Sequence, residues 1–328
     1  MNDARVTIVV VPRDRYGVTE RMLETLYERT PAPFELVYVD VASPRRTRRY
    51  LEARARERGF RLVRFDEVIS PNQARNAGAG LVTTEYTVFI DNDVIVSPDW
   101  LAPLVDRADE TGAWVVGPLY LIGELELGWI HAAGGELLIE GEGDERMMRS
   151  DHLRQGEQLA DLTRPLEART CDFAEFHCML VRTETFAMIG PLDEALLSTR
   201  EHEDFALAIS AQGGRIWTEP RSVVTYLPPP RHPDLVGAFG PPLRPSDVPY
   251  FARRWSERWN EASVEHFRRK HGLGPFFRKR VRNGNEQRIA FLMPLRTVVR
   301  PVFGPRVDDK LTRGLHRLER RLNRRLVR

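Results

Sequence analysis

The chain has 328 residues, of which 42% are apolar and 29% are charged, and these proportions are those of a globular protein with a full hydrophobic core. The formal net charge of +2 excludes a protein that binds nucleic acid through its overall charge. No run approaches the roughly 20 apolar residues that a membrane-spanning helix needs, so we expect a soluble or peripheral protein.

The N-terminal part alternates between apolar runs typical of buried strands and periodic patterns typical of helices. The predicted strands are 6–11, 34–39, 61–65 and 86–90, and the predicted helices are 19–29, 47–58 and 72–80. This alternation predicts an α/β fold with a mostly parallel sheet and flanking helices. Ligands of such sheets bind at the carboxyl ends of the strands, where Pro12, Asp40 and Asp91 fall.

The middle of the chain is less regular. It has predicted strands at 114–122 and 173–182, a hairpin or covering loop at 129–138, a polar stretch at 141–163 and a helix at 204–211. The polar stretch is a candidate for a mobile lid or an insertion. Proline-rich segments then bracket a linker before an amphipathic helix over 250–271. We therefore expect one domain over residues 1–230, and a linker with a basic helical extension over 231–328.

The segment 171–178 contains both cysteines of the chain, Cys171 and Cys178. Their spacing matches no zinc or redox motif, so we expect reduced thiols and a cytoplasmic protein. The first strand begins after five residues and is followed by charged residues without a small-residue cleavage site, which argues against a signal peptide.

Two carboxylates, Asp91 and Asp93, stand one residue apart where the strand 86–90 ends. Side chains alternate along a strand, so both carboxylates share one side if the extended form continues. Two carboxylates with open coordination positions suit Mg²⁺ or Mn²⁺ carrying a phosphorylated substrate. A solvated turn is the alternative, because Asp and Asn are ordinary turn residues.

An ordered set of motifs occupies 74–78, 91–93, 98–101, 179–182, 189–194, 203–205 and 213–216. With these motifs in this order, the chain resembles glycosyltransferase family 2. The resemblance covers roughly residues 6–226 and leaves the C-terminal extension outside. It implies the Rossmann-like GT-A fold and inverting, metal-dependent transfer of a sugar from a nucleotide-diphosphate sugar to a hydroxyl of a saccharide or a lipid-linked acceptor. Such a reaction would serve cell-envelope polysaccharide or glycolipid synthesis.

The resemblance also implies roles on the donor side. Asp93 would bind the Mn²⁺ or Mg²⁺ ion directly, and Asp91 would be either a second ligand or a contact to the ribose. Asp40 would accept a hydrogen bond from the base, next to Pro12 at the end of the first strand. Arg75 would lie near the nucleotide; the alternative is an arginine that ties its helix to a neighbouring carboxylate.

The acceptor hydroxyl must lose its proton, so a carboxylate is expected opposite the metal. By resemblance Asp204 would be this base and Glu203 an acceptor contact or a support of the loop. The alternative is that both only complement the helix dipole. Asp193 is an acceptor ligand or a loop anchor, while His177 and His131 are further acceptor-side candidates, with core packing and loop support as their alternatives.

The chain departs from the family pattern at Tyr226, where many members have a histidine that completes the metal site. Metal binding would then rely on nucleotide oxygens and water, or on a histidine from elsewhere. One alternative function is a sugar-phosphate nucleotidyltransferase, but the first strand is not followed by the expected glycine-rich loop. Another is a non-catalytic relative that binds a sugar nucleotide, against which the intact carboxylate motifs argue.

The C-terminal tail combines leucines at helical spacing with many arginines. The leucines are Leu311, Leu315, Leu318, Leu322 and Leu326. This pattern predicts an amphipathic basic helix on an anionic membrane surface, and hence a peripheral protein at the inner face of the membrane. A helix packed on the first domain and a homodimer seam are the alternatives.

Overall fold

The computed structural model describes residues 4–229, 237–277 and 293–304, and in the tail also 306, 307, 310, 311, 314, 318 and 321. Its centre is a mixed sheet with the strand order β10-β12-β6-β11-β4-β1-β2-β3. The N-terminal strands of this sheet pair in parallel: β1 (Val6–Val11), β2 (Phe34–Val41), β3 (Arg61–Phe65) and β4 (Tyr86–Asp91). These four strands confirm the predicted alternation of strands and helices. Their sequences contain continuous apolar runs because both faces of a central parallel strand are buried.

The second half of the sheet is mixed. Its strands are β5 (Val94–Val96), β6 (Val115–Ile122), β7 (Ile130–Ala132), β10 (Arg169–Cys171), β11 (Cys178–Arg182) and β12 (Ile216–Tyr226). β12 runs parallel to β6, whereas β11 runs antiparallel to both β4 and β6. The antiparallel course of β11 puts its first residues beside the last residues of β4, which is where the predicted ligand edge lies.

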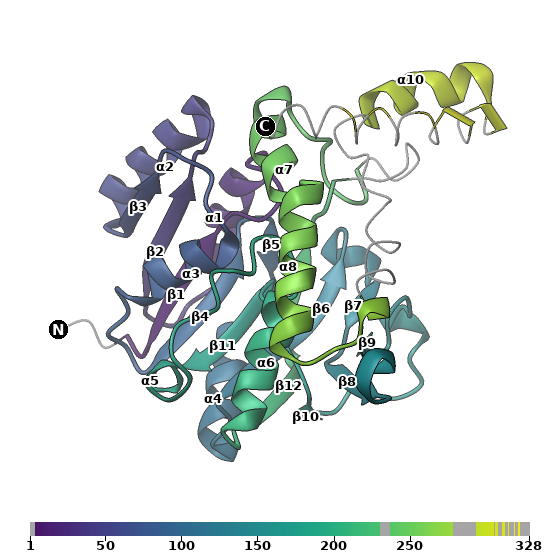
Figure 1. Cartoon of the computed structure of the whole chain (residues 1–328). Coiled ribbons are helices and arrows are strands. Elements are labelled where there is room, and N and C mark those ends of the chain that lie inside the picture. The colour runs from purple at the N-terminus through teal and green to yellow at the C-terminus, as the bar shows by residue number, and fades with distance from the viewer. Residues whose placement is uncertain are drawn as a thin grey trace.

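Helices cover both faces of the sheet (Figure 1). One hydrophobic cluster joins the sheet to α1 (Thr19–Glu28), α2 (Arg45–Arg58) and α4 (Leu101–Thr111). The other joins it to α3 (Pro71–Ala79), α5 (Thr185–Ile189) and α6 (Glu201–Ala211). Gly78 allows α3 to lie against β1, because a Cβ atom at this position would collide with Val9. The sequence patterns did not predict α4.

The segment predicted as a lid or insertion contains a strand. β8 (Gly135–Glu140) and β9 (Met147–His152) form a separate two-stranded antiparallel sheet. Short 3₁₀ helices lie in the connections between these elements: η1 (Leu125–Leu127), η2 (Gly143–Glu145), η3 (Leu159–Asp161) and η5 (Pro245–Asp247). The predicted hairpin over 129–138 is therefore divided, since β7 joins the central sheet and β8 pairs with β9.

The predicted amphipathic helix over 250–271 is two helices, α7 (Val248–Arg254) and α8 (Glu257–Lys270). The break lies at Ser256, whose side chain caps α8 by accepting a hydrogen bond from the Trp259 amide. α8 lies beside α6 (Figure 1) and contributes to a cluster of buried apolar residues with Met148 and Leu196. The structure thus joins this part of the extension to the region before residue 230.

The turn after α8 touches the β8–β9 sheet. The Gly274 amide donates a hydrogen bond of 2.7 Å to the carbonyl oxygen of Arg146. A Cβ atom at residue 274 would collide with the carbonyl oxygen of Asp144, so only glycine permits this approach.

Within the described residues of the tail, Met293–Phe303 form α10 (Figure 1). Val298, Val302 and Phe303 on this helix are 66%, 67% and 64% exposed. Of the leucines that predict an amphipathic tail helix, Leu311 and Leu318 are helical, while Leu315, Leu322 and Leu326 lie outside the described residues. Among the described residues, none of the helices has both the length and the apolar character needed to cross a membrane.

Phe277→Ala tests whether the extension is part of the folded body. Phe277 is 1% exposed and its ring lies 5.8 Å from that of Phe267. The loss of this buried ring is expected to lower the free energy of unfolding by about 3–5 kcal/mol, measured by urea denaturation. The neighbouring Phe276 is 60% exposed, so Phe276→Ala is the matched control, with an expected change within about 0.5 kcal/mol. Equal effects of the two substitutions would contradict the packing of this turn.

Candidate active site

A cavity of about 290 Å³ opens at the carboxyl ends of β1 and β4. Of the residues that the sequence predicts for the site, it brings together Arg75, Asp91, His131, His177 and Glu203. Further polar residues line it that the sequence analysis did not single out: Ser150, His152, Glu175, Ser198, Thr199, Arg200, Glu201 and Arg254. They come from the β8–β9 sheet, from the segment before β11, from the start of α6 and from α7, so the cavity is assembled from distant parts of the chain.

Asp91 ends β4 and is held by cationic and imidazole groups. Its carboxylate lies 3.2 Å from His177 Nδ1 and 3.4 Å from the Arg75 guanidinium, and 3.9 Å from Arg13 Nε. Burial alone would raise the pKa of Asp91, but His177 and Arg75 hold that pKa below its ordinary value. Asp91 is therefore an ionised carboxylate at neutral pH.

Asp93 is fully buried next to Asp91, and neither of its carboxylate oxygens has a hydrogen-bond partner among the described residues. Burial, together with the negative charges of Asp14 and Asp91, raises the pKa of Asp93 to about 8. A buried carboxylate without partners is unfavourable, so the site is one that a cation would stabilise.

His177 lies beside the two carboxylates and completes a group that could hold a metal ion. Ligand atoms of Asp91, Asp93 and His177 all lie within 4.8 Å of one another. Burial, with the nearby charge of Arg13, lowers the pKa of His177 to about 4, so its imidazole is neutral and able to bind a metal. The donor set of two carboxylates and one imidazole fits Mn²⁺.

Tyr226, which stands where many family members have a metal-binding histidine, packs on His177. The two rings are stacked with centroids 4.1 Å apart and an interplanar angle of 15°. The Arg13 guanidinium contacts the His177 ring and lies 5.1 Å from the centroid of the Tyr226 ring. The residue directly before β11 therefore offers an imidazole at a place where the end of β12 has a phenol ring.

Three predicted donor-side residues differ in their surroundings. Arg75 is buried, with its guanidinium 4.0 Å from the centroid of the Phe176 ring, and it both lines the cavity and contacts Asp91. The carbonyl oxygen of Pro12 accepts a hydrogen bond of 2.8 Å from the Tyr250 hydroxyl. Asp40 is fully buried outside the lining of the cavity, and its carboxylate accepts hydrogen bonds from the Arg64 guanidinium and the Ser43 amide.

A second, basic hollow of about 430 Å³ lies next to Asp40. It is lined by Ser43, Arg45, Arg48, Arg49, Glu52 and Arg64. The sequence analysis did not single out these arginines, because they occupy a surface helix and a short strand in which charged residues are common.

The two carboxylates at the start of α6 point to different partners. Glu203 lines the cavity, where one of its oxygens accepts hydrogen bonds from Ser150 and Arg200. The carboxylate of Asp204 accepts hydrogen bonds of 2.9 Å from Lys270 and 2.8 Å from His271, at the end of α8. The structure thus places Asp204, the predicted base, against the extension and outside the lining of the cavity.

Asp193 also contacts α8. Its carboxylate lies 2.8 Å from both His266 Nε2 and Lys270 Nζ. Burial opposes ionisation, but the hydrogen bonds from Lys270 and His266 lower the pKa of Asp193 to about 2. Of its two predicted roles, this position agrees with that of a loop anchor.

The chain belongs to glycosyltransferase family 2. The sequence profile described as "Glycosyl transferase family 2" matches residues 7–186, which is more than half of the chain. This match confirms the family that the ordered motifs predict.

Two proteins named for roles in polysaccharide biosynthesis are similar in sequence. The succinoglycan biosynthesis protein ExoO of Rhizobium meliloti is 32% identical over 34% of this chain and 31% of its own length. The O-antigen biosynthesis protein RfbC of Myxococcus xanthus is 25% identical over 75% of this chain and 20% of its own length. The chain thus spans less than a third of the length of these curated relatives.

Two solved glycosyltransferases share the fold. The structure of GalNAc-T7 with UDP, GalNAc and Mn²⁺ matches with a TM-score of 0.55 and 16% identity, over 80% of this chain and 50% of that one. The mannosyltransferase PcManGT from Pyrobaculum calidifontis, in complex with GDP-Man and Mn²⁺, matches with a TM-score of 0.51 and 16% identity, over 98% of this chain and 85% of that one. The predicted GT-A fold is therefore confirmed.

Asp93→Asn tests whether Asp91, Asp93 and His177 form a metal site. In the unchanged chain, Mn²⁺ at about 100 times its Kd is expected to raise the free energy of unfolding by about 2.7 kcal/mol, because it binds only the folded state. Asp93→Asn removes a ligand and is expected to abolish this increase in urea denaturation. Asp106→Asn, at an exposed position of α4, is the control and should keep it. An undiminished Mn²⁺ effect in Asp93→Asn would exclude Asp93 as a ligand.

Proposed function

We propose that the chain transfers a sugar from a nucleotide-diphosphate sugar to a hydroxyl of a saccharide or lipid-linked acceptor, with inversion, in the synthesis of cell-envelope polysaccharide or glycolipid. The observation that carries this proposal is the buried carboxylate of Asp93, which accepts no hydrogen bond from any described residue and lies beside Asp91 and His177 at the ligand edge of the sheet. The family, and the UDP and GDP-Man in the two similar structures, support a nucleotide-sugar donor.

On the donor side, Asp91, Asp93 and His177 would hold a divalent ion. Such an ion neutralises the negative charge of the leaving diphosphate. Mn²⁺ is the ion favoured by the similar structures, with Mg²⁺ as the alternative. Arg13 and Arg75 keep positive charge next to Asp91, and this charge helps to orient a phosphate group entering the cavity.

On the acceptor side, we assign proton removal to Glu203. One of its oxygens is fixed by Ser150 and Arg200, while the other lies 3.2 Å from His202 Nε2 without forming a hydrogen bond to any described residue. Burial opposes ionisation of Glu203, but Arg200 and His202 hold its pKa below the ordinary value. An ionised carboxylate oxygen without a hydrogen-bond donor is suited to accept the proton of the attacking hydroxyl.

Asp204 has a structural role in this proposal. Both of its oxygens are hydrogen-bonded to the end of α8, and its side chain lies outside the lining of the cavity. Asp193 and Asp204 together share Lys270 and hold α8 against the catalytic body.

Glu203→Gln and Asp204→Asn form a matched pair that separates the two roles. Glu203→Gln removes the proton acceptor and is expected to lower the transfer rate at saturating donor about 10²- to 10⁴-fold while donor affinity, measured by calorimetry, stays the same. Asp204→Asn weakens the contacts to Lys270 and His271, so it is expected to lower the Tm and leave the transfer rate within about threefold. The reverse result, with transfer lost only in Asp204→Asn, would return the role of base to Asp204.

The second part of the proposal is that the tail attaches the chain to an anionic membrane surface at the cytoplasmic face. The exposed apolar side chains of α10, together with the excess of basic residues after residue 278, support this role. A lipid-linked acceptor would be presented at such a surface.

A chain ending at Phe277 is expected to fold as the full chain does but to lose binding to anionic liposomes. Each basic residue near an anionic surface contributes about 1 kcal/mol, so binding of the full chain should fall as the salt concentration rises. Co-sedimentation with anionic and with neutral liposomes measures this, and the neutral liposomes are the control. Equal sedimentation of the two chains would remove the membrane role from the tail.

A further inference from the structure

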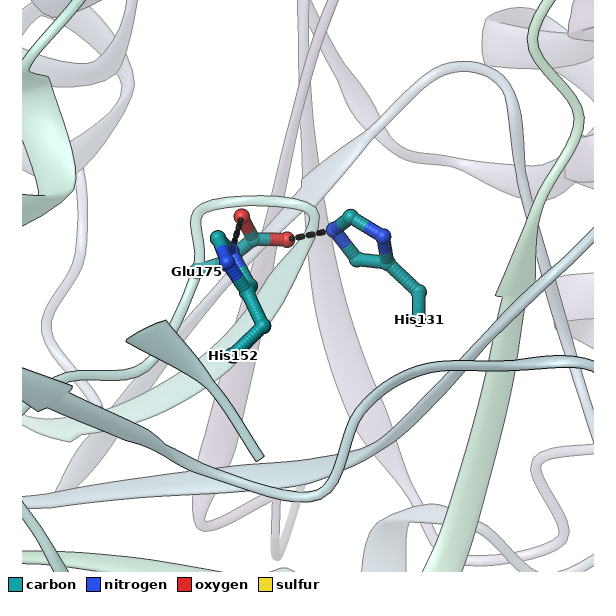
Figure 2. Close-up of side chains that lie close together, drawn as sticks. All are labelled: His131, His152 and Glu175. Carbon is teal, nitrogen blue, oxygen red and sulfur yellow. Dashed lines mark hydrogen bonds and ion pairs between the residues drawn. The ribbon is translucent and has the colours of Figure 1, made fainter. Parts of the chain in front are cut away.

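A second group of metal-binding side chains lies in the same cavity, beside the donor-side carboxylates. Figure 2 shows His131 and His152 directed from different sides at the carboxylate of Glu175. The Nε2 atom of His131 lies 2.9 Å from one carboxylate oxygen of Glu175, and the Nε2 atom of His152 lies 2.8 Å from the other. The three side chains come from β7, from the end of β9 and from the segment before β11, so only the folded chain assembles them.

The spacing of this group suits a shared metal ion. One ligand atom of each residue lies within 4.8 Å of those of the other two. Two ligand atoms that are each about 2.1 Å from a tetrahedral Zn²⁺ ion lie roughly 3.4 Å from each other, so each hydrogen-bonded pair would widen by only about 0.5 Å to admit the ion. Two imidazoles and one carboxylate are a donor set that binds Zn²⁺ and related transition ions and leaves further positions open.

The surroundings hold these ligands in place. Glu175 is fixed through its backbone, because its amide donates a hydrogen bond of 3.0 Å to the Tyr120 hydroxyl, which in turn donates one of 2.7 Å to the carbonyl oxygen of Cys178. The other ring nitrogen of His131, Nδ1, lies 3.5 Å from the Tyr226 hydroxyl. A polar partner on the second nitrogen is the usual arrangement for a histidine that binds a metal.

The lining of the cavity is also rich in imidazoles. Four of the eight histidines of the chain line this cavity: His131, His152, His177 and His202. Three of them, His131, His152 and His177, lie 2.9, 2.8 and 3.5 Å from the carboxylate of Glu175.

We propose that His131, His152 and Glu175 form a second metal centre, which binds Zn²⁺ or another divalent transition ion without a nucleotide. It shares no ligand with the group of Asp91, Asp93 and His177, although His177 Nε2 lies 3.5 Å from Glu175. Because all three ligands line the cavity, the open positions of the ion face it and can take a hydroxyl or phosphate oxygen of a bound molecule.

The experiment uses Co²⁺ as the probe, because its visible absorption reports on its ligands. Asp93→Asn first weakens the donor-side site. In this background Co²⁺ is expected to bind in a ratio of one ion per chain, measured by equilibrium dialysis and absorption. Adding His152→Asn is expected to weaken this binding more than about 100-fold. Adding His266→Asn instead is the matched control, since His266 lies on α8 and contacts Asp193, and binding should not change.

Two results would overturn the proposal: no Co²⁺ bound by Asp93→Asn, or undiminished binding after His152→Asn is added. Circular dichroism establishes that each variant is folded. If His152→Asn unfolds the chain, His131→Gln in the same background takes its place, with the same expectation. The readout is metal binding without donor or acceptor, so failure here is separate from failure of the proposed transfer reaction, which depends on Glu203.

Discussion

The antiparallel pairing of β11 with β4 is the constraint on which the site depends. In a parallel neighbour, the carboxyl end of a strand would lie beside Asp91. Here the amino end of β11 lies there instead, and the Asp91 amide donates a hydrogen bond of 3.0 Å to the carbonyl oxygen of His177. This register brings His177 to the carboxylates at the end of β4. It also brings Glu175, which lies two residues earlier in the chain, to the histidines of β7 and β9. A different register would separate His177 and Glu175 from these partners.

The buried charges around the cavity are mostly paired, and the pairing explains why Asp93 stands out. Arg75 contacts Asp91, Arg200 contacts Glu203, and Arg254 contacts Glu201. Removing one member of a buried pair leaves an uncompensated charge, so such pairs fix which side chains face one another. No described residue donates a hydrogen bond to the carboxylate of Asp93, in a region where the neighbouring carboxylates accept one.

The sequence was sufficient for the first four strands and for α1, α2 and α3, because apolar runs and helical periodicity are local signals. Asp91 and Asp93 were predictable for the same reason, since they are adjacent to a strong strand pattern. His152 and Glu175 were not, because segments far apart in sequence bring them together and no local pattern marks either one. A histidine from another part of the chain was one of the alternatives for completing the metal site. The pairing of β11 with β4 places His177 next to Asp91.

The choice between Glu203 and Asp204 shows a different limit. Successive residues of a helix point about 100° apart, so two adjacent carboxylates at the start of α6 face different neighbours. Which of them faces the cavity depends on where α8 packs, and α8 lies outside the part of the chain that the family motifs cover. The division of the predicted helix into α7 and α8 at Ser256 was also not predicted. A serine within an amphipathic pattern does not by itself mark the start of a helix, whereas its hydrogen bond in the structure does.

The contact of Gly274 with the backbone of Asp144 and Arg146 has a consequence for protein engineering. The β8–β9 sheet supplies Ser150 and His152 to the cavity, so it is a natural segment to exchange when a different acceptor specificity is sought. Its far end, however, is fitted to a backbone without a side chain in the turn after α8. A graft of this hairpin into another glycosyltransferase must therefore carry that turn with it, and the two segments behave as a single transplantable unit.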